Sequence, residues 1–323
     1  MPAYLIVILS IVSFIALVII VLTLISRCYY KRSLMATISE CYLRVTENKL
    51  PDEQVINELP LLPLLNDKKV FCPKKYSKLV KTEEYDIDGI QTFVFNNQKS
   101  TNTCAIYLHG AGYVRQPRKQ HWKFVTKLAK KSGITVVFPI YPKAPNHTYE
   151  ESYSKITKLY LDVRDRFEKV VLMGDSSGGG LALGLAEDFI KKDIKQPDQL
   201  ILISPWVDIT LENTQIVKYE KTDPIVCVSN DRIWGKSWAG GKNLKNYKVS
   251  PIYGNMLGLK SVTLFVGTRE ALYPDIKILE EILKDSKAKV KTFIGKGLNH
   301  VYPIFPIPEA KKAMKNIIKI ILN

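Results

Sequence analysis

Residues 170–180 read Val-Val-Leu-Met-Gly-Asp-Ser-Ser-Gly-Gly-Gly. The apolar run at 170–173 predicts a buried strand, and the mostly apolar residues 181–190 predict a helix. Between them, residues 174–178 form a Gly-x-Ser-x-Gly pattern, which at a sharp strand-to-helix turn presents its central serine above a sheet. Ser176 is therefore the predicted nucleophile. A Gly/Ser-rich loop that simply begins a helix is the alternative, and the flanking strand and helix argue against it.

A second glycine-rich turn follows another predicted strand. Residues 103–108 are mostly apolar, and His-Gly-Ala-Gly occupies 109–112. A serine nucleophile requires N–H donors for the oxyanion of its tetrahedral intermediate. A glycine-rich turn supplies backbone N–H groups without an obstructing side chain. The two turns together therefore predict a hydrolytic site.

Seven short motifs follow one another along the chain. They are His109-Gly-Ala-Gly112, Tyr141-Pro-Lys-Ala-Pro145, Gly174-Asp-Ser-Ser-Gly-Gly179, Ser204-Pro-Trp-Val-Asp208, Asp223-Pro-Ile225, Gly267-Thr-Arg-Glu270 and Gly297-Leu-Asn-His300. In this order they resemble the hormone-sensitive-lipase-like branch of the α/β-hydrolase superfamily, from about Val70 to the C-terminus. The resemblance implies a serine esterase or lipase that works through an acyl-enzyme and uses no metal or organic cofactor.

The sequence contains four histidines, of which His300 is the best-placed candidate for the general base. His109 belongs to the glycine-rich turn, His121 begins a predicted helix and His147 follows a proline-rich loop. His300 lies between the last predicted strand and the C-terminal helix, in the chain order serine, acid, histidine that is typical of this fold. We expect it to accept the proton of Ser176 and to return it to the leaving alcohol.

The triad acid is predicted at Glu270, where most relatives carry aspartate. Glutamate also serves in this fold, because its carboxylate can still fix the tautomer of the imidazole. Asp275, five residues further on, is the alternative acid. Arg269 is a complication, because an ion pair with Glu270 would turn the carboxylate away from His300.

Two residues of the glycine-rich motifs depart from the family pattern. Ala111 replaces the second glycine of His-Gly-Gly-Gly, and Ser177 replaces the alanine after the nucleophile. Provided that the backbone angles of Ala111 permit, the resemblance implies an oxyanion hole with N–H donors at Ala111, Gly112 and Ser177, in which Gly110 sets the turn. Ser177 is disfavoured as the nucleophile because the two glycines of the pattern frame Ser176.

From Val70 onward, predicted strands alternate with predicted helices. We expect strands at 81–86, 91–95, 103–108, 135–139, 170–173, 200–203, 262–266 and 290–294. We expect helices at 119–131, 150–167, 181–192, 275–284 and 309–322. This alternation is typical of an α/β fold with a mostly parallel sheet that helices cover on both faces. Together with the motifs, it predicts the α/β-hydrolase fold.

The N-terminal segment is predicted to be a membrane anchor over residues 1–26. Residues 5–25 carry no charge and would form a helix about 31 Å long, enough to cross a hydrocarbon core. A cleaved signal peptide is the alternative, but it requires positive charge before a shorter apolar run and a small-residue cleavage site. The basic residues Arg27, Lys31 and Arg32 instead follow the run, so the positive-inside rule places the catalytic domain in the cytoplasm.

Two segments are predicted to cover the site as a cap on a catalytic domain at 70–323. Residues 27–69 read as amphipathic helices, for which a plain linker between membrane and domain is the alternative. Residues 208–248 interrupt the strand–helix alternation and match the family's second cap element. Trp234 and Trp238 in this insertion are suited equally to lining an acyl pocket and to ordinary packing.

Composition excludes several other classes of protein. The formal net charge is +16, from 47 basic and 31 acidic residues. Without a basic stripe interleaved with aromatics, this charge predicts no nucleic-acid partner. It fits an anionic membrane surface or, more simply, a lysine-rich solvated surface. The five scattered cysteines form no Cys-x-x-Cys pair, so they predict neither a disulfide framework nor a zinc site.

The sequence therefore predicts a membrane-anchored serine carboxylesterase or lipase-like hydrolase that acts on a small-molecule or lipid-like ester. A peptidase or amidase on the same fold, an acyltransferase, and a non-enzymatic membrane-tethered binding protein are the alternatives. The complete set of Ser176, Glu270 and His300 argues against the last of these. The oligomeric state is not predicted.

Overall fold

A computed structural model describes residues 2–47, 49–97 and 102–323, and within these residues eight strands form one sheet. They are β1 (Thr82–Ile87), β2 (Ile90–Phe95), β3 (Thr103–Leu108), β4 (Thr135–Pro139), β5 (Lys169–Asp175), β6 (Gln199–Ile203), β7 (Ser261–Gly267) and β8 (Lys289–Gly295). Their spatial order is β1-β2-β4-β3-β5-β6-β7-β8. β2 pairs antiparallel with β1 and β4, and all pairs from β4 to β8 are parallel. The predicted mostly parallel sheet is confirmed.

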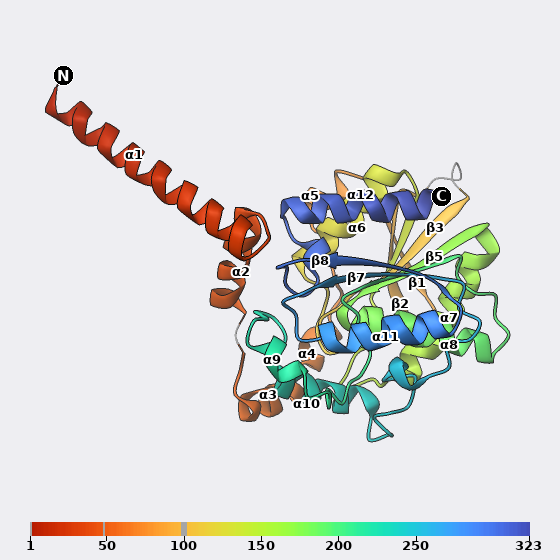
Figure 1. Ribbon diagram of the computed structural model, residues 1–323. Coiled ribbons are helices and arrows are strands. Elements are labelled where there is room, and N and C mark those ends of the chain that lie inside the picture. Colours follow the sequence, from red (N-terminus) through yellow and green to blue (C-terminus); the bar gives the residue numbers. More distant parts are fainter. Residues whose placement is uncertain (1, 48, 98–101) are drawn as a thin grey trace.

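Helices cover both faces of this sheet (Figure 1). The α-helices of the described residues are α1 (Ala3–Leu24), α2 (Leu34–Thr46), α3 (Asp52–Glu58), α4 (Pro63–Asn66), α5 (Lys74–Ser77), α6 (Lys119–Ser132), α7 (Tyr149–Arg166), α8 (Ser176–Lys191), α9 (Ile216–Glu220), α10 (Val228–Ala239), α11 (Tyr273–Asp285) and α12 (Pro308–Leu322). α6 and α12 pack on one face, and α7, α8 and α11 pack on the other.

Strand β5 shows why the central strands read as continuous apolar runs. Val170 and Leu172 join the core beneath α7 and α8, whereas Val171 and Met173 join the core beneath α6 and α12. Successive side chains of a strand point to opposite faces, and here both faces are buried. The strand therefore carries apolar residues at every position instead of alternating ones.

The parallel pairing brings distant loops to one edge of the sheet. The glycine-rich turn at 109–112 follows β3, Ser176 follows β5, Glu270 follows β7 and His300 follows β8. Because the carboxyl ends of parallel strands lie at the same edge, residues up to 191 positions apart in the sequence become neighbours.

The largest difference in a predicted boundary concerns α8, which begins at Ser176 and not at residue 181. The three glycines at 178–180 have poor helix propensity and therefore hide the first turn of the helix from sequence-based prediction. Their value is steric, because Gly178 packs directly against the end of β3 at Leu108, while Gly179 and Gly180 pack against Pro205 and Trp206 after β6. The boundaries of the strands agree with prediction within two residues.

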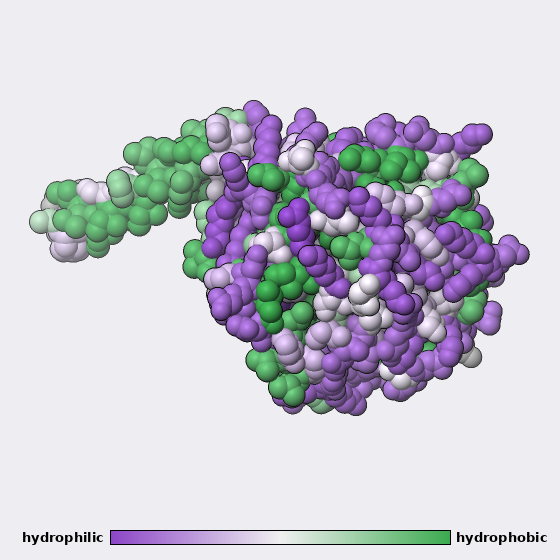
Figure 2. Space-filling model, turned by 90° about the horizontal axis from the view of Figure 1, so that it is seen from below, coloured by the Kyte–Doolittle hydropathy of each residue, from purple (hydrophilic) through white to green (hydrophobic). Residues whose placement is uncertain are grey.

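The apolar N-terminal segment forms one long helix that stands apart from the rest of the molecule (Figure 1). α1 continues through a π-helical turn at Ile25–Tyr29, and the segment 3–29 is long and apolar enough to cross a membrane, with a mean hydropathy of 3.4 over its most apolar 18 residues. Figure 2 shows apolar side chains along its length. No residue of α1 is buried, so burial against the protein does not account for its apolar composition.

Candidate active site

Ser176 occupies the sharp turn between β5 and α8. Its φ is +51°, a left-handed conformation that costs a residue other than glycine roughly 1–2 kcal/mol. The neighbouring glycines make the turn possible: a Cβ at Gly174 would lie 2.3 Å from the carbonyl oxygen of Gly178, and a Cβ at Gly178 would lie 2.1 Å from that of Leu108. The sequence at this turn thus presents a serine hydroxyl at the carboxyl edge of the sheet.

His300 reaches Ser176 from the loop after β8. A hydrogen bond of 2.9 Å joins its Nε2 to the Oγ of Ser176, and the His300 side chain is almost fully buried. The next residue, Val301, is β-branched and yet adopts a φ of +50°. Its N–H donates to the Oγ of Ser204 at 3.0 Å, which fixes the backbone directly after the imidazole.

Glu270 lies on the other side of the imidazole and is completely buried. Its Oε2 is 3.8 Å from the Nδ1 of His300, an ion-pair separation that is longer than a hydrogen bond. The same oxygen accepts hydrogen bonds from the Oγ of Ser204 at 2.7 Å and from the N–H of Gly267 at 3.2 Å. Ser204 therefore connects the loop of Glu270 with the loop of His300.

Asp275, the alternative acid, and Arg269, the possible partner of Glu270, both bind other side chains. The Oδ1 of Asp275 accepts a hydrogen bond of 2.7 Å from the side chain of Asn213, at the start of α11. The Nη2 of Arg269 lies 3.0 Å from the Oε1 of Glu40 on α2. The structure thus brings Ser176, His300 and Glu270 together, and it directs Arg269 away from Glu270.

Neighbouring carboxylates determine the direction in which the pKa of the His300 imidazole shifts. Burial by itself would lower the pKa of His300, but Glu270 first, and then Asp223 and Asp231, outweigh burial and raise it above its ordinary value. Burial raises the pKa of the Glu270 carboxyl, while the His300 ring and the Ser204 hydroxyl oppose that shift. An imidazolium formed next to Ser176 is thus stabilised by neighbouring negative charge.

The glycine-rich turn has the backbone conformation that the sequence left open. Ala111 has a φ of +98° and Gly112 a φ of +69°, so Ala111 adopts a conformation that favours glycine. The N–H of Gly110 donates to the Oδ1 of Asp175 at 3.0 Å, which ties the turn to β5. Among the described residues, the N–H groups of Ala111, Gly112 and Ser177 find no acceptor, so they remain available to a ligand.

The other three histidines have structural partners. Burial lowers the pKa of His109 well below its usual range, and its ring stacks on Tyr141 with a centroid separation of 4.6 Å. The Nε2 of His121 lies 3.1 Å from the Oδ2 of Asp175. The Nδ1 of His147 lies 2.5 Å from the Oε2 of Glu151 on α7. None of these three contacts the Ser176 hydroxyl in the described part of the chain.

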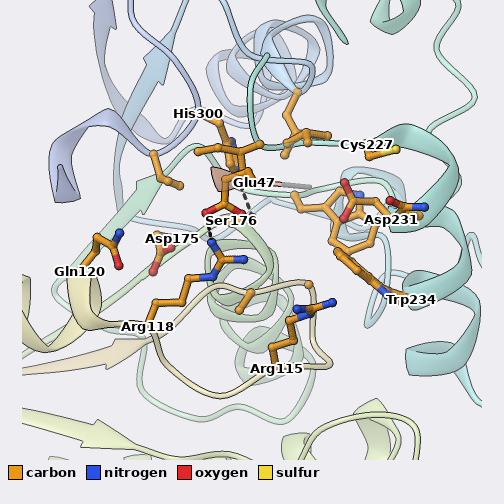
Figure 3. A pocket seen from close by; sticks show the side chains of 18 of the residues that line it. Glu47, Arg115, Arg118, Gln120, Asp175, Ser176, Cys227, Asp231, Trp234 and His300 are labelled. Carbon is orange, nitrogen blue, oxygen red and sulfur yellow. Dashed lines mark hydrogen bonds and ion pairs between the residues drawn. The ribbon is translucent and has the colours of Figure 1, made fainter. Parts of the chain in front are cut away.

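Ser176 and His300 open into a cavity of about 630 Å³ (Figure 3). Two distant segments line it beside the sheet edge: the stretch from the end of α2 through α3, and the stretch that leads into α10. These segments also bind one another, because the side-chain amide of Asn230 donates to the carbonyl oxygen of Leu50 at 2.9 Å. Trp234 lines the cavity, whereas Trp238 is buried against Tyr113 with a ring separation of 4.4 Å.

Five charged residues of the cavity were missed by sequence reasoning: Glu47, Glu58, Arg115, Arg118 and Asp231. Arg118 pairs with Glu47 across the opening (Figure 3), and the guanidinium of Arg115 lies over the ring of Trp234 at 5.5 Å. Burial raises the pKa of Asp231 to about 7. No motif marks these residues, and only the positions of Glu47, Glu58 and Asp231 on predicted cap segments hinted at their place.

Comparison with known proteins agrees with this architecture. The profile of a family described as having the alpha/beta hydrolase fold matches residues 105–304, which is well over half of the chain. The candidate esterase of Staphylococcus aureus has a crystal structure that superposes with a TM-score of 0.80 at 30% sequence identity, covering 84% of this chain and 92% of that one. The chain therefore belongs to the α/β-hydrolase family, in the branch that resembles hormone-sensitive lipase.

Relatives with assigned activities narrow the class further. LipR of Mycobacterium tuberculosis, named as a candidate acetyl-hydrolase, is 28% identical over 224 residues, 68% of this chain and 72% of its own length. An esterase of Acinetobacter venetianus is 26% identical over 244 residues, 71% of this chain and 78% of its own. The protein is accordingly an esterase- or lipase-like hydrolase.

Proposed function

We propose that this protein is a serine carboxylesterase in which Ser176, His300 and Glu270 form the catalytic triad. The observation that carries the proposal is the 2.9 Å hydrogen bond between Ser176 and His300 at the mouth of a cavity. This arrangement activates a serine for acyl transfer: the hydroxyl lies on a strained turn, a base contacts it, and a buried carboxylate lies beyond the base.

The proposed reaction proceeds in two halves. His300 takes the proton from Ser176 while the serine oxygen bonds to the ester carbonyl carbon, and the resulting oxyanion accepts hydrogen bonds from the N–H groups of Ala111, Gly112 and Ser177. The imidazolium then gives this proton to the departing alkoxide, which leaves as the alcohol. Water, deprotonated by His300, cleaves the acyl-enzyme and releases the acid.

The direct test uses a fluorophosphonate probe and a series of aryl esters of increasing acyl length on the full chain in detergent. Probe labelling and ester hydrolysis are expected, and inert behaviour toward both would instead favour a binding protein. A matched pair of ester and amide substrates separates an esterase from the peptidase or amidase alternative. Preference for the amide would overturn the proposed reaction class.

The segments at 27–69 and 208–248 are proposed to form the cap that shapes the acyl site. Support comes from the cavity lining, in which Leu50 from the first segment and Trp234 from the second lie on the same cavity as Ser176. Apolar and aromatic walls with a few charged groups fit an ester of moderate apolar character. Hydrolysis rates are accordingly expected to rise with acyl length and then to fall once the chain exceeds the cavity.

We propose that α1 anchors the protein in a membrane with the catalytic domain in the cytoplasm. Two exposed basic residues, Arg27 and Lys31, directly follow the apolar helix and support this orientation. Arg32, the third residue of the predicted basic cluster, is buried in an ion pair with Glu40, so its charge is not free for the membrane surface.

Protease protection measures this orientation. In right-side-out vesicles, an external protease is expected to leave the catalytic domain intact until the membrane is permeabilised. Digestion of the domain without permeabilisation would place it on the outer side. Release of the full domain into the soluble fraction would remove the anchor from the proposal.

The pH dependence of activity reports the charge near His300. The base must be neutral to accept a proton, so kcat/KM is expected to fall as the pH drops through the raised pKa of His300. Asp231→Asn removes a carboxyl group that is negatively charged above its own pKa of about 7 and then favours the imidazolium, so the acidic limb of the profile should move modestly to lower pH. Asp162→Asn, on the exposed surface of α7, serves as the matched control. A shift in the opposite direction would contradict the assignment of His300 as the base.

A further inference from the structure

Helix α2 presents an apolar face to solvent. Its four large exposed apolar side chains are Met35, Ile38, Tyr42 and Val45, with exposed fractions of 50%, 50%, 65% and 81%. Their spacing of three, four and three residues places them on one side of the helix. A surface helix of a soluble protein normally turns this side toward the core.

The opposite side of α2 is buried and carries Ala36, Leu43 and one charged residue, Glu40. Glu40 is 4% exposed and binds Arg32, Arg44 and Arg269, with its Oε1 at 2.8 Å from the Nη2 of Arg44 and at 3.0 Å from the Nη2 of Arg269. Burial would raise the pKa of Glu40, but these guanidinium groups hold it at about 2. The contacts of Ala36, Leu43 and Glu40 already attach α2 to the protein, so its second apolar side faces outward with no contact that accounts for it.

The position of α2 in the chain indicates what this outward face contacts. The long apolar helix ends at Tyr29 and α2 begins at Leu34, so the connection spans at most about 17 Å. If α1 crosses a bilayer, α2 lies within reach of the headgroup region. Exposed Arg27 and Lys31 flank the connection and match anionic headgroups in charge.

We infer that α2 is an interfacial helix, whose face formed by Met35, Ile38, Tyr42 and Val45 lies in the surface of a lipid bilayer. This inference rests on the anchor proposed above. An amphipathic helix of this kind buries its apolar side roughly 5–10 Å into the boundary between headgroups and acyl chains. The bilayer then covers the apolar side chains that the protein leaves exposed.

The contacts of α2 give this placement a consequence for the active site. Glu40 holds Arg269, the neighbour of Glu270, and Arg32 donates to the carbonyl oxygen of Gly297 at 3.0 Å, three residues before His300. The end of α2 at Thr46 also lines the cavity. The helix that lies on the lipid therefore also holds both candidate catalytic loops, and it brings the cavity entrance close to substrate dissolved in the bilayer.

Depth-dependent quenching tests the inference on the full chain in proteoliposomes of anionic phospholipid. After Cys28, Cys41, Cys72 and Cys227 are replaced by serine, single cysteines at Phe14→Cys, Ile38→Cys and Leu161→Cys carry an environment-sensitive fluorophore. Position 14 reports α1, position 38 the centre of the apolar face, and position 161 an exposed site on α7 as the control. Brominated lipids are expected to quench position 38 at least about twofold more than position 161. Fluorophosphonate labelling in the same samples reports the proposed esterase function separately.

Each outcome has a distinct meaning. Quenching at 14 without quenching at 38 would keep the anchor and overturn the interfacial helix. Quenching at 38 without quenching at 14 would support the surface helix and remove the spanning anchor. Shielding of 38 from aqueous iodide without lipid quenching, together with crosslinking between copies at 38, would assign the face to a second copy and overturn the inference. Loss of probe labelling with quenching at 38 intact would affect only the proposed esterase function.

Substrate preference provides an independent functional measurement. The double variant Ile38→Asn/Val45→Asn is expected to lower hydrolysis of a bilayer-resident long-chain ester severalfold relative to a water-soluble acetate ester. The control variant Leu161→Asn/Ile278→Asn alters two exposed apolar residues of α7 and α11 and should leave the ratio unchanged. An unchanged ratio in the first variant would contradict delivery of substrate from the lipid surface.

Discussion

Replacing Ser176 with alanine is expected to abolish fluorophosphonate labelling and to lower kcat by at least about 10³-fold. The reason is that the Oγ of Ser176 is the atom that would bond to the ester carbon, and it is the hydroxyl that His300 contacts at 2.9 Å. The fold should persist, because alanine fits the turn as serine does and leaves Gly174 and Gly178 in place. Initial rates on an aryl acetate and intact-protein mass after probe treatment provide the measurement.

Ser177→Ala is the matched control for this prediction. Ser177 is also buried, but its Oγ accepts a long hydrogen bond of 3.3 Å from the N–H of Tyr113 and makes no hydrogen bond with His300, and its own N–H survives the substitution. A much smaller loss of activity is therefore expected. Labelling that persists in Ser176→Ala and disappears in Ser177→Ala would move the nucleophile to residue 177.

Glu270→Gln is expected to lower kcat by roughly 10²–10⁴-fold with little change in melting temperature. A neutral amide keeps the volume of the side chain, but it stabilises neither the imidazolium nor the productive tautomer of the imidazole, which costs about 10⁴ in a well-studied triad. Glu270→Asp should retain partial activity because the carboxylate survives with a shorter reach. Steady-state kinetics and thermal denaturation of the same samples separate catalysis from stability.

Asp275→Asn is the control that distinguishes the two candidate acids. The side chain of Asp275 is held by Asn213 at the start of α11, so this substitution should lower activity by less than about tenfold, the effect of losing roughly 1 kcal/mol of local stabilisation. The reverse ranking, with Asp275→Asn inactive and Glu270→Gln near wild type, would transfer the acid to Asp275. The roles proposed for Ser176 and His300 would be unaffected.

The parts of the structure that sequence predicted well are those that depend on local pattern. The apolar runs of the strands, such as 170–173, read directly as buried elements because both faces of the sheet are covered. The positions of Ser176, Glu270 and His300 at strand ends followed from motifs in a fixed order. Alternation of strands and helices then placed these loops at a single edge of the sheet.

The conformation of Ala111 marks the limit of such local reasoning. Its sequence shows only that alanine stands where relatives carry glycine, and the φ of +98° is imposed by the turn that Gly110 makes with Asp175. The partner of Arg269 could not be predicted from the local sequence either. Sequence proximity allowed a pair with Glu270, whereas the structure places Glu40 of α2, 229 residues away in the chain, beside the guanidinium.

The sequence by itself determined the α/β class, the apolar N-terminal helix and the identity of the candidate triad, because each of these is encoded in periodicity or in a short motif. Only the tertiary structure decided which face of α2 is buried, which tryptophan lines the cavity, and that Asp231 and His300 line the same cavity. These features depend on how segments separated by tens to hundreds of residues close on one another. Contacts between distant side chains, and the apolar surface that they bury together, stabilise these arrangements. A local sequence pattern does not show which distant side chains will meet.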